Sequence, residues 1–128
     1  MEFILKTGIS HTTIKVVGTQ DLAISYGSGT VAVFATPAMI ALMECAATQA
    51  IAPYLPEGYT TVGVAVNIEH NKATPLGAKV EAIAVLAKVD GKRLDLNVMA
   101  FDETGEIGKG THTRYIVDEI KFMENLPK

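Results

Sequence analysis

Residues 36–52 read TPAMIALMECAATQAIA, and this stretch decides the fold. Thr36 offers a hydroxyl suited to capping free amide protons, and Pro37 has the fixed φ that fits a first helical position. Pro53 disfavours helical geometry in the residue before it. We therefore expect a helix from Thr36 to about Ala52.

The composition of this helix differs from that of a surface helix. A surface helix shows one apolar stripe and one charged face, whereas residues 36–52 are rich in alanine and apolar on nearly every side. Pro37, Glu44, Gln49 and Pro53 interrupt the apolar region, which argues against a membrane span. The rest of the chain is therefore expected to wrap around the helix.

The residues after the helix predict the layer that wraps it. Four segments read as strands separated by turn signals: 61–69, 78–89, 93–101 and 107–117. Apolar residues alternate along two of them: Val62, Val64, Val66 and Ile68, and then Leu94, Leu96 and Val98. Asp90-Gly91 is a hairpin signal. Consecutive strands joined by such turns predict an antiparallel meander.

The residues before the helix add two shorter strands. Ile14, Val16 and Val17 suit the first, and the apolar run 31–35 suits the second. Together these elements predict an α+β fold, a curved antiparallel β-sheet wrapped around one long central helix. This order and these proportions are those of a hot-dog fold.

Length and composition limit the organisation and the partners. A chain of 128 residues, 48% of them hydrophobic, can hold one core, so residues 1–128 are expected to form a single domain. The net charge of -3 offers no basic surface for nucleic acid or an anionic membrane, and neither is expected as a partner. Cys45 is the single cysteine, and the N-terminus has no signal-peptide pattern, which favours a cytoplasmic location. An unpaired sheet edge favours a homodimer.

Glu44 is a carboxylate within the apolar helix. Burial of an unpaired carboxylate costs several kcal/mol, so Glu44 must face a partner, a cavity or water. It either lies on a wet strip with Thr48 or pairs with a lysine across an interface, or it lines a cleft where a nearby imidazole tunes it for general-base work. Thr36 either caps the helix or holds a reacting oxygen beside the free amides. Eight helical residues span about 12 Å, enough to bracket a substrate.

Two further groups of polar residues lie on the predicted strands. His70 ends the first long strand, where the alternation places it on the helix side, and it is either a structural hydrogen-bonding residue or a functional one. His112 and Arg114 share one face of the last strand, as an ordinary polar outer face or as a cationic pair for a phosphate or nucleotide tail. The three histidines lack recognised metal-ligand spacing, so no metal site is expected.

These residues together resemble a known family. Thr36-Pro37, Glu44 eight residues on, and His70 followed by Thr74-Pro75 and Gly77 are similar to the hot-dog thioesterases of the fluoroacetyl-CoA thioesterase-like family. The resemblance covers nearly the whole chain and implies that Thr36, Glu44 and His70 form the catalytic constellation. Residues 26–30, rich in Gly and Ser, do not match the aromatic gate of the fluoroacetyl enzyme, which leaves the fluorinated substrate open.

The resemblance also implies how substrate is held. Gly63, seven residues before the histidine, matches a glycine whose amide contacts the substrate carbonyl. Gly110, His112 and Arg114 resemble the region that binds coenzyme A. Members of the family are homodimers with active sites at the subunit interface.

The expected function is therefore that of an acyl-CoA thioesterase. It would hydrolyse a short-chain acyl-CoA to free acid and CoA, with coenzyme A as part of the substrate and no other cofactor. The alternative is a non-catalytic acyl-CoA or acyl-carrier binding protein, because a fold does not fix a function. A hydratase on the same fold is a third candidate.

Overall fold

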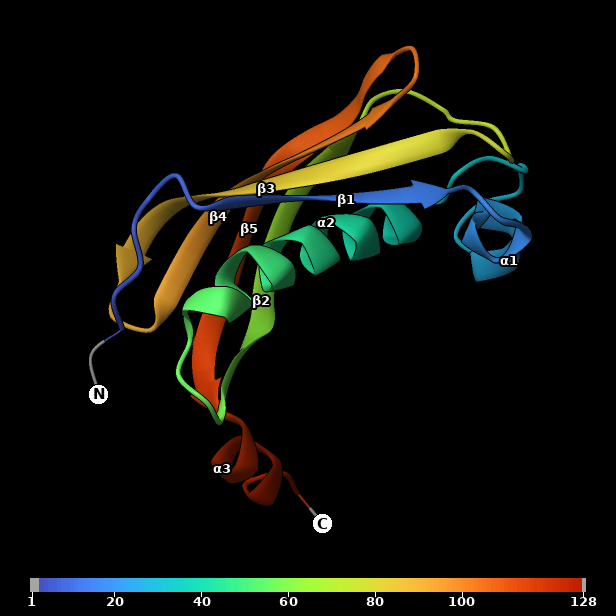
Figure 1. The fold of residues 1–128 in the computed structure, drawn as a ribbon. Coiled ribbons are helices and arrows are strands. Elements are labelled where there is room, and N and C mark those ends of the chain that lie inside the picture. Colours follow the sequence, from blue (N-terminus) through green and yellow to red (C-terminus); the bar gives the residue numbers. More distant parts are fainter. Residues whose placement is uncertain (1–2, 128) are drawn as a thin grey trace.

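The computed structural model describes residues 3–127. One antiparallel sheet curves around the long helix α2 (Thr36–Ile51), as Figure 1 shows. Its strands are β1 (Ser10–Val16), β2 (Tyr59–His70), β3 (Lys79–Asp90), β4 (Arg93–Asp102) and β5 (Gly105–Asp118). The strand order is β1-β3-β4-β5-β2, so β1 and β2 form the two edges. The predicted α+β architecture is confirmed.

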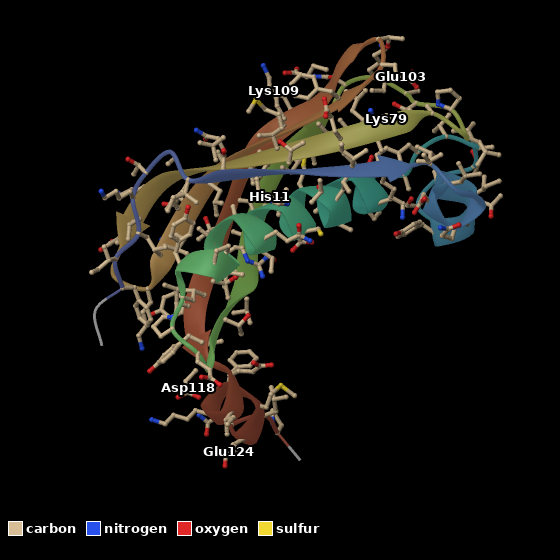
Figure 2. All side chains as sticks on the ribbon, in the orientation of Figure 1. His11, Lys79, Glu103, Lys109, Asp118 and Glu124 are labelled. Atoms are coloured by element: carbon tan, nitrogen blue, oxygen red, sulfur yellow. The ribbon has the colours of Figure 1, made fainter. Side chains whose placement is uncertain are left out.

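Three short elements complete the fold. The helix α1 (Ala23–Tyr26) lies near the N-terminal end of α2, and 3-10 turns occupy Thr19–Asp21 and Ala52–Tyr54. The helix α3 (Glu119–Glu124) begins after Asp118, whose side chain accepts a hydrogen bond from Lys121 N, and projects beyond the sheet (Figure 2). No helix within residues 3–127 is long and apolar enough to cross a bilayer.

Helix α2 begins at Thr36 as predicted, but its capping differs from the prediction. Ala35 occupies the N-cap position in extended geometry, and no side chain caps the helix. Thr36 is the first helical residue, and Pro37 after it has no N–H that would need a partner in the first turn. The expected capping role of Thr36 is therefore wrong, and its hydroxyl is free for another contact.

The core lies between α2 and the strands β1, β3 and β4. It is built from large side chains that are almost fully buried, among them Met39, Met43 and Ile51 of the helix and Leu86, Leu94 and Leu96 of the sheet. Thr13 Oγ1 of β1 donates a hydrogen bond to the Leu42 carbonyl oxygen at 3.1 Å. The helix is wrapped on this side, whereas Ala41 and Cys45 on its opposite side are exposed.

The predicted alternation holds in β4, where Leu94, Leu96 and Val98 are all buried, and fails in β2. In β2, Gly63 pairs with Arg114 but Ala65 pairs with Thr113, so Val64 is an extra residue in a β-bulge.

Directly paired residues point to the same face of a sheet. Val62, opposite the exposed Tyr115, faces outward, whereas Ile68 packs against the core. The bulge thus turns both Gly63 and His70 toward the helix.

The predicted strand over residues 31–35 is wrong. Only isolated bridges form there, between Val33 and Pro75 and between Leu22 and Phe34. The segment crosses between two loops and meets no strand edge along which a ladder could extend.

Candidate active site

Thr36 and His70 meet at the N-terminal end of α2. Thr36 Oγ1 lies 2.7 Å from His70 Nδ1, and the hydroxyl can donate to this nitrogen of the neutral ring. The contact forms because Ala35 precedes the helix as its N-cap, and because the bulge in β2 turns His70 inward. The structure thus brings together two residues that lie far apart in the sequence.

The surroundings of His70 favour its neutral form. Burial lowers the pKa of the ring below its ordinary value of 6.5, and the nearby backbone of Lys72 partly opposes this. His70 Nε2 is buried and has no hydrogen-bond partner among residues 3–127. A neutral imidazole at this distance can accept the proton of the Thr36 hydroxyl.

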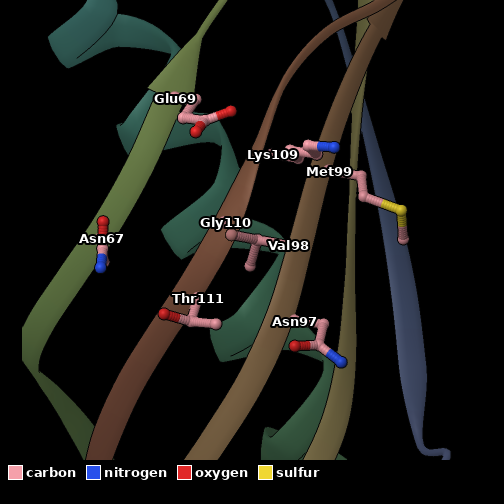
Figure 3. A pocket seen from close by; sticks show the side chains of 8 residues that line it. All are labelled: Asn67, Glu69, Asn97, Val98, Met99, Lys109, Gly110 and Thr111. Carbon is pink, nitrogen blue, oxygen red and sulfur yellow. The ribbon is translucent and has the colours of Figure 1, made fainter.

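The Thr36 and His70 pair lies in the wall of an open cleft of about 360 Å³. The cleft is lined by Ala23, Ser28, Val33, Phe34, Thr36, His70, Asn71, Lys72 and Ala73. A larger hollow of about 520 Å³ lies on the outer face of the sheet, with α2 behind it (Figure 3). Of the residues expected near the substrate only Gly110 lines this outer hollow, and none of the predicted catalytic residues does, so the smaller cleft is the better candidate for chemistry.

The remaining predicted residues form a second group, where the middle of α2 lies beside Gly63 of β2 and Arg114 of β5. Arg114 Nη1 lies 3.1 Å from His112 Nε2 and 4.0 Å from Glu44 Oε2. Glu44 is half-exposed, and within its own chain its ionic partner is Arg114. Thr48 donates to the backbone carbonyl of Glu44 and not to its carboxylate.

The interpretation of His112 and Arg114 as a polar outer face is wrong. They are 2% and 7% exposed, and both face the helix because Arg114 pairs with Gly63 and His112 with Val66. Sequence alternation could assign the two residues to one face, but not say which face is buried.

Thr61 is a residue of this group that sequence reasoning missed. Its hydroxyl accepts a hydrogen bond from Arg114 Nε at 2.8 Å, and its carbonyl accepts one from Arg114 Nη2 at 2.9 Å. Burial lowers the pKa of Arg114, and the negative charge of Glu44 opposes this. The guanidinium is thus a fixed cation facing Glu44. In the sequence, Thr61 could have been noticed only as a hydroxyl residue two positions before Gly63 on the same strand.

Gly63 stands at a close approach between the β2 backbone and the side chains of Glu44 and Arg114. A Cβ at this position would lie 2.9 Å from Glu44 Oε2 and 3.2 Å from Arg114 Nη1. Without a side chain, the β2 backbone lies directly against this ion pair. The structure therefore gathers Glu44, Gly63, His112 and Arg114 into one group and leaves Thr36 and His70 as another.

Within residues 3–127, no cluster of three or more His, Cys, Asp or Glu side chains could hold a metal ion. The side chains gathered at the candidate site carry hydroxyl, imidazole, carboxylate and guanidinium groups. Such groups serve acid, base and nucleophilic steps.

Comparison with solved structures defines the class of fold. A hot-dog-like protein from Thermanaerovibrio acidaminovorans superposes with a TM-score of 0.84 over 97% of this chain and 95% of its own, at 23% identity. A hypothetical Thermus thermophilus protein of the thioesterase superfamily gives 0.87 over 94% and 90%, at 27% identity. The fold is that of the hot-dog proteins, as predicted.

Closer similarity then gives the family. Residues 17–120 match the family of fluoroacetyl-CoA-specific thioesterases, and the chain belongs to that family. The fluoroacetyl-CoA thioesterase of Streptantibioticus cattleyicolor is 46% identical over 90 residues, which are 70% of this chain and 65% of that relative's length. The solved fluoroacetyl-CoA thioesterase FlK is 35% identical, with a TM-score of 0.88 over 97% of this chain and 99% of its own.

Proposed function

We propose that the protein is an acyl-CoA thioesterase that hydrolyses a short-chain acyl-CoA to free acid and CoA. The observation that carries the proposal is the 2.7 Å contact between Thr36 Oγ1 and His70 Nδ1 in the wall of a cleft, in a chain of this family. A variant of FlK was solved with fluoroacetate and CoA, which supports coenzyme A as the carrier of the acyl group here. No separate cofactor is proposed.

The catalytic roles go to Thr36, Glu44 and His70. His70 accepts the Thr36 proton, and Thr36 Oγ1 either attacks the thioester carbonyl or positions the attacking water. Glu44 activates water or takes the acyl group. In each route the C–S bond breaks, the CoA sulfur takes up a proton, and the oxygen of water ends in the acid.

Gly63, His112 and Arg114 are proposed to bind substrate. The Gly63 amide and the start of α2 would stabilise negative charge developing on the carbonyl oxygen. His112 and Arg114 are buried beside Glu44, which favours the acyl and carbonyl end of the substrate over the phosphates as their contact.

We further propose that the active protein is a homodimer. Strand β2 leaves its outer edge unpaired, and Val64 and Val66 on it are 59% and 46% exposed. A second copy pairing along β2 would cover these side chains and the gap beside Gly63 and His70.

The remaining expectations stand as part of the same proposal. Residues 1–128 would form a single domain, of which residues 1, 2 and 128 lie outside the described part. A cytoplasmic location fits a chain with one cysteine, and its net charge of -3 fits neither nucleic acid nor a membrane surface as partner.

The test is thiol release from acetyl-, fluoroacetyl-, butyryl-, benzoyl- and long-chain acyl-CoA. We expect turnover by the wild type and a loss of at least about 100-fold for Glu44→Gln and for His70→Ala. Glu69→Gln is the matched control, because Glu69 adjoins His70 but pairs with the outward-facing Lys109. Near-full activity in both active-site variants would overturn the assignment, and tight binding of acyl-CoA without turnover would indicate the binding protein instead.

A further inference from the structure

Thr74 links the two segments that carry Thr36 and His70. It follows His70 by four residues and is fully buried. Its carbonyl accepts a hydrogen bond from the amide of Phe34, two residues before Thr36, at 2.8 Å. Its hydroxyl donates to Asp102 Oδ2 at 3.0 Å. One side chain and its own backbone thus join the approach to α2, the loop after β2 and the end of β4.

Asp102 is a fixed anchor for this contact. Its other oxygen, Oδ1, accepts from Thr104 N at 2.8 Å and Thr104 Oγ1 at 2.6 Å, and Lys72 Nζ lies 3.5 Å away. Burial alone would raise the pKa of Asp102, but the hydrogen bonds from Thr104 and Thr74 and the charge of Lys72 lower it to about 2. The carboxylate is therefore ionised at neutral pH, with both oxygens engaged.

Backbone bonds hold the two ends of the loop over residues 71–78. Asn71 N donates to Ile107 O at 2.8 Å, and Gly77 N donates to Val17 O at 2.9 Å. Between these ends, Thr74 attaches the loop to Asp102 and to Phe34. A displacement of Thr74 would therefore move Phe34 and the residues after His70 relative to each other.

We propose that Thr74 and Asp102 are positioning residues that keep Thr36 and His70 at hydrogen-bonding distance. They line no part of the cleft and act through Phe34 and the loop that follows His70. A misplacement of reacting groups by about 1 Å can cost about 100-fold in rate, so a loosened loop is expected to slow the reaction. The kinetic part of this inference rests on the proposed thioesterase function, and the geometric part does not.

The decisive variant is Thr74→Val, which keeps the shape of the side chain and removes the hydroxyl. We expect kcat to fall about tenfold or more while KM changes less than about twofold, because the substrate contacts remain. Thr74→Ser restores the hydroxyl and should recover most of kcat. Asp102→Asn offers a second variant of nearly unchanged volume and should lower kcat in the same direction.

Thr113→Val is the matched control. Thr113 Oγ1 donates to Asp95 Oδ1 at 2.7 Å, so the same kind of pair joins β5 to β4 away from the cleft. Thr113→Val is expected to leave kcat and KM unchanged even if it lowers Tm. Equal kcat values for Thr74→Val and Thr113→Val would mean that Thr74 is merely structural and would overturn the proposal.

Titration of the His70 ring by NMR tests the geometry without any substrate. In the wild type the pKa should lie below 6.5, and in Thr74→Val it should move toward 6.5 as the ring gains access to water. An unchanged His70 titration in a folded Thr74→Val protein would refute the positioning role. A wild type without thioesterase activity would refute the proposed function, and the titration would still decide the role of Thr74.

Discussion

The two edges of the sheet, β1 and β2, differ in what covers their inner faces. Strand β1 lies against α2, and Thr13 of β1 bonds directly to the helix backbone. Strand β2 is exposed over residues 63–67, and its last residue, His70, lines the cleft beside Thr36.

The two edge strands do not differ in how far their apolar side chains are exposed. Ile14 and Val16 of β1 are 59% and 62% exposed, as much as Val64 of β2. The covered edge serves stability, whereas the uncovered edge carries Gly63 and His70 of the candidate site. Chemistry needs a gap in the packing, and this fold leaves one at β2.

The largest expected effect contrasts the two histidines of the edge strands. His70→Ala should lower thiol release by at least about 100-fold, because Thr36 loses its proton acceptor. His11→Ala, in the exposed part of β1, should leave the rate within about twofold. Comparable losses in both variants would mean that the edges do not differ in function.

The next contrast concerns assembly. Val64→Lys with Val66→Lys should weaken dimerisation by at least about 30-fold, because two charges would be buried where strand β2 meets its partner. Ile14→Lys with Val16→Lys on β1 should leave the dimer intact. Sedimentation velocity over a range of concentrations measures dimerisation of both double variants. Loss of the dimer in the β1 variant alone would mean that the interface lies along β1, and it would contradict the proposal.

The third expectation concerns pH. Because burial lowers the pKa of His70 below 6.5, kcat/KM should stay level down to that lowered pKa and then fall about tenfold per pH unit as the ring gains a proton. The same group affects stability in the same direction. Its neutral form supports the fold above pH 6.5, and this contribution is lost as the pH falls toward the folded-state pKa. A pH-rate profile of the wild type that falls already above pH 6.5 would contradict the assignment.

The smallest effect belongs to the covered edge. Thr13→Val removes the hydrogen bond to the Leu42 carbonyl and should cost about 1 kcal/mol of unfolding free energy. Denaturant unfolding measures this change, and kcat should be unaffected. A lower kcat with unchanged stability would show that β1 contributes to the chemistry after all.

The sequence predicted those features that depend on local chemistry. The start of α2 follows from Pro37, and the strands from alternation and from turn signals such as Asp90-Gly91. The position of His70 on the helix side was also predicted, although the regular alternation used to reach it does not hold through Val64.

Features that depend on contacts between distant segments were not accessible in this way. The hydroxyl of Thr36 turns to His70 instead of capping, because Ala35 occupies the cap position. His112 and Arg114 face inward because β5 pairs with β2 in one particular register. Neither the cap geometry nor the register is encoded in a local pattern.

The bulge at Val64 also decides whether Gly63 and His70 lie on the same face of β2. Residues seven apart point to opposite faces of a regular strand, and only the extra residue lets both face the helix. Deletion of Val64 would therefore remove the bulge and leave the glycine and the histidine six positions apart on a regular strand, where both still face α2. In related chains, the separation in sequence between the glycine and the histidine must be odd where a single bulge lies between them and even where the strand is regular.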